Sequence, residues 1–344
     1  MRIDFHFYTI YALARAVGFS PENAYVIAYA SQYTDDEVTD KTILFENGGQ
    51  FEPFITAHKI FNPQNLLKDD CKRIWIPFHF LPGTIGEGDE QILTKPDCTI
   101  IQRMIDQFLS YDLLPYSRHL LGIMLHAYAD SWSHQNFMGI IADINKVNDL
   151  KVNGEDIMLY RIAPPLGHAQ TGSTPDDPSL EWEYSDSKGE FRHIINHDRA
   201  IDAAHHCYLM LSRFINKFAD DFLDSRPIPW DQIQDKIMEL FQGASDLKDC
   251  INAWGNAISN NEIGFNSHDR DINLIYDEGE WFNIAIKSES RMNPESGQFE
   301  DYYYRNEIYE VSDLKYFNDS AQFYWSTLFV ENAKILGLKD YFNL

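Results

Sequence analysis

Apolar residues recur at helical spacing along much of the chain. Residues 117–137 (SRHLLGIMLHAYADSWSHQNF) are apolar on nearly every side of a helix, with Leu120 and Trp132 among the apolar positions. A helix that is apolar all round is typically buried within a protein. The pattern therefore predicts a buried central helix over residues 115–134, around which the rest of the chain packs.

Start and stop signals mark the other predicted helices. Gly18 ends a first helix, and Ser20 followed by Pro21 caps the start of a second. Asp97 is the expected N-cap of a later one. The helices expected from these signals and from helical periodicity span residues 4–17, 21–36, 98–114, 197–223, 230–241, 245–258 and 312–342.

Extended structure is predicted only weakly. Residues 41–57 read as a hairpin around Asn47, Gly48 and Gly49. The segment RIWIPFHFLPG indicates an extended stretch with a buried His79. Residues 139–190 are predicted to be rich in loops. The segment DYYYRNEIYE is interpreted as a strand or a lid. The fold class expected is therefore all-α, mostly helical with long loops and one minor β-hairpin.

The composition fits a single helical domain over residues 1–344. We expect the candidate metal site, described below, in the first half, residues 1–180. The second half, residues 181–344, is expected to supply packing helices and aromatic segments. Of the 344 residues, 44% are hydrophobic and 14% aromatic, which suffices for a large core. The four cysteines form no Cys-x2-Cys pair, so buried free thiols are expected. Asp4 and His6 interrupt any apolar leader, and no run is long enough to span a bilayer, so we expect a cytoplasmic protein without integral membrane association.

The formal net charge of −25 narrows the class of partner. A broad electrostatic grip on duplex nucleic acid or an anionic membrane needs an excess of Lys and Arg. A small molecule or a short polar substrate is therefore expected, and the pattern specifies no oligomeric state.

Ionisable side chains share one stripe of the central helix. His126, Asp130 and His134 recur every four residues, and His119 lies seven residues before His126. Imidazole and carboxylate on adjacent turns suit divalent transition ions. The alternative is a core helix whose histidines bond to carbonyl groups. His126 and His134 are about 12 Å apart on a regular helix, so either two ions share Asp130 or the helix ends before His134.

Further candidate ligands lie outside the central helix. Asp35 and Asp36 end the second helix, where the helix dipole disfavours negative charge, so they are either a solvated pair or include one carboxylate that faces a metal. His168 and Asp176 lie in a Gly- and Pro-rich loop, where polar residues are often functional. A separate hypothesis, that the dipeptide His197-Asp198 serves a phosphohydrolase, is weaker because Asp198 also suits a first helical turn.

The order of these blocks resembles a bacterial family of unknown function over residues 1–180. The segments carrying the resemblance are DFHFYTIYALARAVGFSPENAYVIAYASQYTDD, FHFLPG, HLLGIMLHAYADSWSHQNF and LGHAQTGSTPDDP. More distantly, the arrangement is similar to the zinc-dependent phospholipase C and single-strand nuclease superfamily, which implies a helical fold with a trinuclear site. The resemblance assigns metal-binding roles to His6, Asp35 or Asp36, His79, His126, Asp130, His134 and His168.

Departures from that superfamily are visible. Its chains begin with a tryptophan whose amino group binds a metal, whereas Met1 and Arg2 stand here, and Asp4 is the candidate substitute. A carboxylate expected four residues after His168 is replaced by Gly172, which makes Asp176 the candidate in its place.

The resemblance implies a metal-dependent hydrolase of phosphoester bonds with two or three ions, zinc or another divalent transition metal. Asp35 or Asp36 would orient the attacking water as the catalytic carboxylate. The alternative is a non-catalytic, metal-stabilised helical scaffold or binding protein, in which a closed ligand shell only stabilises the helices.

Overall fold

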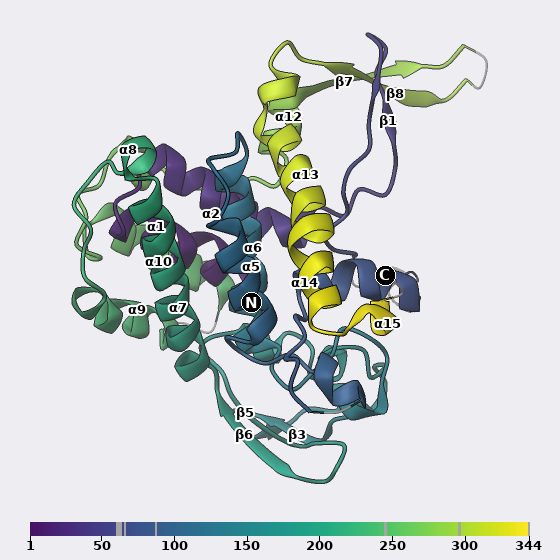
Figure 1. The fold of residues 1–344 in the computed structure, drawn as a ribbon, viewed down its shortest axis with the longest axis vertical. Coiled ribbons are helices and arrows are strands. Elements are labelled where there is room, and N and C mark those ends of the chain that lie inside the picture. The colour runs from purple at the N-terminus through teal and green to yellow at the C-terminus, as the bar shows by residue number, and fades with distance from the viewer. Residues whose placement is uncertain (60–63, 65–66, 87, 244–245, 295–296, 343–344) are drawn as a thin grey trace.

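The computed structural model describes residues 1–59, 64, 67–86, 88–243, 246–294 and 297–342. Helices dominate it, as the apolar periodicity predicted (Figure 1). Their bounds are α1 Ile10–Ala16, α2 Pro21–Asp36, α3 Lys68–Asp70, α4 Ile76–Phe78, α5 Thr99–Phe108, α6 Ser117–Ser133, α7 Asn196–Lys217, α8 Ala219–Phe222, α9 Gln234–Phe241, α10 Leu247–Ser259, α11 Asp269–Ile272, α12 Glu280–Ala285, α13 Asp313–Phe323, α14 Val330–Ile335 and α15 Lys339–Phe342. Position 245, the expected start of one helix, lies outside the described residues.

Three helical segments have π geometry and continue neighbouring α-helices. They are Asp4–Thr9 before α1, Cys71–Trp75 between α3 and α4, and Tyr324–Phe329 between α13 and α14. π-Helical turns are rare and frequently occur at functional sites. The first of them carries His6, and the second leads into the helix that His79 ends.

The buried central helix is α6, and its apolar residues lie within one large core. α2 packs along it, α7 lies against it, and α13 covers a further side (Figure 1). The core includes residues from both ends of the chain, such as Phe5, Leu211 and Leu328. The helices after residue 196 therefore bury the same central helix as the N-terminal ones.

Among the described residues, the strands form three antiparallel sheets, so the sequence analysis underestimated the β structure when it predicted one minor hairpin. The predicted hairpin in residues 41–57 is present as β1 (Ile43–Leu44) paired with β2 (Gln50–Phe51). A longer hairpin, β7 (Ile286–Met292) with β8 (Phe299–Arg305), lies beside it and protrudes from the helices, linked through Phe45 and Tyr303 (Figure 1).

The four-stranded sheet lies in the segment that was expected to be loop. Its order is β4-β3-β5-β6, with β3 Asn148–Val152, β4 Glu155–Asp156, β5 Glu181–Ser185 and β6 Phe191–Ile195. Val152 pairs with Trp182, which in turn pairs with Ile194. The inward faces of these strands build a second, smaller core with Phe80 and Phe137.

Local expectations were also wrong at three places. The segment around His79 is helical rather than extended, because α4 precedes it and its backbone N–H bonds to Trp75. The N-cap of α5 is Cys98, since the carboxylate of Asp97 contacts Tyr128 instead. The central helix begins at Ser117 rather than at residue 115.

The four cysteines are buried thiols outside any disulfide, as their spacing predicted. In the described part of the chain, every helix is too short or too polar to cross a membrane.

Candidate metal centre

The central helix ends where its third ionisable residue begins. His126 and Asp130 lie within α6, while His134 is the C-cap, and its backbone N–H still bonds to the Asp130 carbonyl at 2.9 Å. His134 therefore leaves the regular helix. Its ring then returns toward the helix, with Nδ1 3.7 Å from Asp130 Oδ2. The same carboxylate oxygen is 3.2 Å from His126 Nε2, so Asp130 contacts both histidines although they belong to different groups of ligand atoms.

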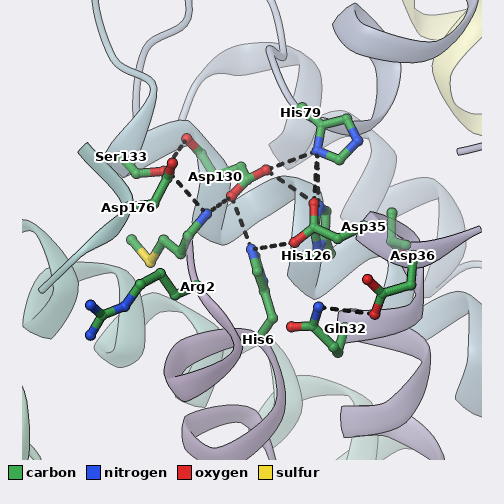
Figure 2. A network of polar contacts seen from close by, with 12 residues as sticks. Arg2, His6, Gln32, Asp35, Asp36, His79, His126, Asp130, Ser133 and Asp176 are labelled. Atoms are coloured by element: carbon green, nitrogen blue, oxygen red, sulfur yellow. Dashed lines mark hydrogen bonds and ion pairs between the residues drawn. The ribbon is translucent and has the colours of Figure 1, made fainter. Parts of the chain in front are cut away.

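Asp130 lies at the centre of the cluster and is almost wholly buried (Figure 2). Its Oδ1 is 3.1 Å from His6 Nε2. Its Oδ2 is 3.2 Å from both His79 Nδ1 and His126 Nε2. The π-helical N-terminal segment, the turn after α4 and the central helix thus meet at one carboxylate.

Asp35, at the end of α2, faces the same group from another side (Figure 2). Its Oδ1 is 3.6 Å from His79 Nδ1 and 3.7 Å from His126 Nε2. Its Oδ2 is 3.9 Å from His6 Nε2. Asp35 therefore approaches the three imidazoles that also surround Asp130.

Asp36 faces away from the cluster, although the sequence could not separate it from Asp35. Its Oδ2 accepts hydrogen bonds from Gln32 Nε2 at 3.1 Å and from the Tyr276 hydroxyl at 2.5 Å. Figure 2 shows it beside Gln32, apart from the histidines. Of the two acids, only Asp35 contacts the cluster.

A second group of ligand atoms adjoins the first. His134 Nε2 is 3.0 Å from Asp176 Oδ1, and His168 Nε2 is 3.6 Å from Asp176 Oδ2. His168 and Asp176 flank short 3₁₀ turns in the loop before β5. The polar loop identified in the sequence therefore folds over the end of α6.

Three of the histidines have their outward ring nitrogens bonded to backbone carbonyls. His79 Nε2 is 2.9 Å from the Thr56 carbonyl, His134 Nδ1 is 2.7 Å from the His79 carbonyl, and His168 Nδ1 is 2.9 Å from the Gly172 carbonyl. Because a carbonyl only accepts, each of these nitrogens carries the proton. The opposite nitrogen then presents a lone pair to the cluster, as in metal-ligating histidines.

The electrostatics of the cluster favour a bound cation. Burial opposes ionisation of Asp130, but the amino group of Met1 and the neighbouring imidazoles outweigh it, so the pKa of this carboxyl lies well below its usual value. Desolvation raises the pKa of Asp35 to about 7, and the Asp130 carboxylate acts in the same direction. Three carboxylates, with that of Asp176, therefore share a small volume that positive charge would stabilise.

The amino group of Met1 also contacts the cluster, although the sequence had left open whether this group takes part in the site. The amino group of Met1 contacts Asp130 and lies 3.3 Å from Asp176 Oδ1. Arg2 anchors this segment, because its guanidinium pairs with Asp177 and with Asp4 at 2.8 Å. Asp4 is thus occupied by Arg2 and does not substitute for the amino group as expected.

The other candidate groups lie elsewhere. His119 is buried on the same helix but pairs with Asp313 at 2.9 Å, which links α6 to α13. His197 and Asp198 are partly exposed, with their nearest side-chain atoms 3.8 Å apart. Neither pair contributes to the groups of described residues that could hold a metal ion.

The donor set fits divalent transition ions. The ligand atoms form three groups, each lying within 4.8 Å of one another: His6, His126 and Asp130; Asp35, His79 and His126; His134, His168 and Asp176. Ligands bound at zinc distances in a tetrahedron are separated from one another by about 3.3 Å. The contacts of 3.0–3.9 Å described above bracket that value.

Comparison with known protein families matches residues 1–331 to DUF6765, a family of unknown function. The chain belongs to DUF6765. The DUF6765 match spans nearly the whole chain, well beyond the residues 1–180 that carry the resemblance in the sequence. No curated protein and no solved structure matches the chain. Similarity to the phospholipase C and nuclease superfamily stays a prediction.

Proposed function

We propose that the protein is a metal-dependent hydrolase of phosphoester bonds, with two or three divalent transition ions, zinc among the candidates. The observation that carries the proposal is the convergence of imidazole nitrogens on two neighbouring carboxylates, with His6, His79 and His126 facing Asp130 and His134 and His168 facing Asp176. The carbonyls of Thr56, His79 and Gly172 fix the outward N–H groups, so the rings are oriented before any ion binds.

Solvent access supports a catalytic rather than a purely structural site. The side chain of Asp35 is 34% exposed, and those of His168 and Asp176 are 18% and 16% exposed. A structural site is typically closed, whereas a catalytic one keeps an open position for water or substrate. Solvent reaches the cluster beside the Asp35 carboxylate, so a substrate would enter there.

The residues divide the work as follows. Divalent ions bound here would stabilise negative charge on the phosphoryl oxygens and promote ionisation of water. Asp35 lies on the open side and is placed to orient the attacking water and accept its proton. Buried Asp130 contacts His6, His79 and His126 as well as His134, and so fixes the position of the first cluster relative to the group that contains His134. The acidic surface favours small or short substrates that reach the site without an extended phosphate backbone.

One observation favours the alternative of a non-catalytic, metal-stabilised scaffold. His6, His79, His126 and Asp130 are almost fully buried, as expected of ligands whose main effect is on stability. Removing the exposed Asp35 carboxylate distinguishes the two functions. It should slow hydrolysis if the protein is an enzyme, whereas a scaffold catalyses no reaction that could be slowed.

The test compares two adjacent acids. We expect protein purified without chelator to contain more than one equivalent of metal. We also expect Asp35→Asn to lower hydrolysis of bis(4-nitrophenyl) phosphate by at least about 100-fold, the usual contribution of a positioned proton acceptor. Asp36→Asn is the matched control and should hydrolyse the diester at the unmodified rate.

Metal-loaded protein that hydrolyses neither bis(4-nitrophenyl) phosphate nor 4-nitrophenyl phosphate would favour the scaffold. A metal content near zero would contradict both functions.

A further inference from the structure

A cavity adjoins Phe137, whose ring centroid lies 6.3 Å from that of His168 in the candidate metal centre. This cavity of about 300 Å³, here called the Lys95 pocket, is lined by Ile85, Gly86, Glu90, Leu93, Lys95, Asn136, Phe137, Ile144, Lys146, Tyr184, Asp186, Ser187, Lys188, Glu190 and Arg192. Its volume is at the lower end of the range for small-molecule sites. It shares no residue with the groups that could hold a metal.

Basic side chains gather in this pocket although they are scarce in the protein. The chain has 28 Lys and Arg residues against 53 acidic ones, yet Lys95, Lys146, Lys188 and Arg192 all line the cavity. The lining also includes Glu90, Asp186 and Glu190, so an anion is attracted only where one of the cations lacks an acidic partner.

Three of these cations are already neutralised. Lys188 Nζ lies 2.9 Å from Glu90 Oε1. Arg192 pairs with Asp186 at 2.8 Å and with Glu190 at 2.6 Å. The third, Lys146, pairs with an exposed acid at 2.8 Å.

Lys95 differs from them. Its ammonium donates to the amide oxygen of Asn136 at 2.6 Å, and the structure records no carboxylate oxygen within 4 Å of it among the described residues. Burial lowers its pKa, and the nearby Arg192 guanidinium lowers it further. Lys95 is therefore a half-buried cation whose hydrogen-bond partner is a neutral oxygen, while the Glu90 carboxylate acts on it from a greater distance and raises its pKa.

The position of Lys95 is fixed by its surroundings. A Cβ added at Gly83 would lie 2.4 Å from Lys95 Cγ, so the aliphatic stem packs directly on the glycine backbone. Backbone hydrogen bonds of 2.8 and 3.0 Å join Thr94 to Phe137 and Asn136. The ammonium is thus held in place before any ligand arrives, which reduces the entropy lost on binding.

Apolar and aromatic groups complete the walls. The rings of Phe137 and Tyr184 stack with centroids 6.1 Å apart, and Leu93 and Ile144 add aliphatic surface. A bare inorganic ion would leave these walls without a partner, whereas an anion with an apolar body would cover them.

We propose that the Lys95 pocket binds a small organic anion, a carboxylate or phosphate on an apolar body, whose charged group is bound by Lys95. This site is separate from the metal centre and does not depend on the proposed hydrolysis.

Isothermal titration calorimetry of the full-length, metal-loaded protein with benzoate and with phenylphosphonate, which has no ester bond to hydrolyse, tests the proposal. At least one probe should bind saturably at one site, and the tighter probe identifies the preferred head group. Lys95→Met keeps the stem that packs on Gly83 but removes the charge. It should weaken binding about tenfold or more, the usual value of a hydrogen bond to a charged group.

Lys151→Met is the matched control. Lys151 lies on β3 outside the pocket and pairs with Glu183 at 2.9 Å, so removing it changes the net charge equally without touching the cavity. Binding should be unchanged. If Lys95→Met fails to fold, Lys95→Gln removes the charge while keeping a donor for Asn136, and the same loss is expected.

Three results would overturn the proposal. The first is that neither probe binds saturably. The second is that the charge-removing variants bind the probe as tightly as the unmodified protein does, which would place the probe elsewhere, including at the metal centre. The third is that inorganic phosphate binds as tightly as phenylphosphonate, which would contradict the role of the apolar walls.

Discussion

At the scale of single residues, Asp130 connects the two groups of ligands. Its two oxygens contact histidines from three separate segments, and the carboxylate is almost wholly buried. Removing a charge from such a position leaves its partners uncompensated, which commonly costs about 3–5 kcal/mol.

We therefore predict that Asp130→Asn lowers metal content and melting temperature together. The amide preserves the shape but not the charge that offsets the cations, so stability should fall by about 3 kcal/mol or more. Metal analysis and thermal unfolding of the same preparation measure both effects.

Asp143→Asn is the control, because the side chain of Asp143 is 89% exposed and pairs only with Lys146 in the described structure. It should change neither quantity. If Asp130→Asn keeps full metal and an unchanged melting temperature, then Asp130 does not bridge ions, and α6 is a core helix that bears histidines.

At this scale, the sequence indicated the types and spacings of the site residues better than the directions in which their side chains point. The i, i+4 pattern was enough to place His126 beside Asp130. The sequence could not determine whether Asp35 or Asp36 faces inward. Adjacent helical residues point about 100° apart, so the rotation of α2 about its own axis decides which of the two faces the site. That rotation is fixed partly by Tyr276, which lies 240 residues from Asp36 in the chain.

At the scale of elements, the site depends on the close contact of α2 with α6. A Cβ added at Gly122 in α6 would lie 2.4 Å from the Ile27 carbonyl oxygen and 2.6 Å from Ala30 Cβ. Asp35 and His126 lie about one turn beyond this crossing on their respective helices. The spacing of these two ligands is therefore set by a residue without a side chain.

We predict that Gly122→Ala destabilises the protein by about 1–3 kcal/mol through overpacking. It should also weaken metal affinity, because the added methyl group separates the helices that carry Asp35 and His126. Denaturant unfolding and competitive metal titration measure the two effects.

Gly255→Ala provides a matched comparison. Gly255 lies within α10, and an added Cβ there meets nothing within 4 Å among the described residues. Stability should stay level or rise by up to about 1 kcal/mol because alanine favours the helix. Equal effects of the two substitutions would show that the helix crossing does not control the site.

Long periodic helices were predicted well, while the four-stranded sheet was missed. Its strands have five residues or fewer and carry many polar side chains, as in β5 (EWEYS). The stability of these strands comes from pairing across distant segments and from packing under Phe80 and Phe137, which no local pattern records.

At the scale of the whole molecule, metal binding should be linked to folding. The ligands come from both sides of α6, and its core includes residues from both ends of the chain. An ion that binds only the folded state stabilises it by mass action.

We predict that removal of metal with a chelator lowers the melting temperature, and that zinc restores it. The apo protein must hold the carboxylates of Asp35, Asp130 and Asp176 together without metal ions, with the Met1 amino group as a neighbouring cation, which is electrostatically less favourable than the metal-bound state. Differential scanning calorimetry before and after metal is restored measures the effect. An identical melting temperature in chelator would contradict this linkage.

The scattered origin of the ligands also has a kinetic consequence. His6 and Asp176 are 170 residues apart in the chain, and Asp35, His79 and His126 lie between them. Long loops must close before such contacts form, which places them late in folding. During synthesis, the first and last ligands cannot meet until the ribosome has released residue 176. We therefore expect metal capture to be a late step of maturation, and slow closure of the loop that carries Asp176 should appear as incompletely loaded protein whose helices are already folded.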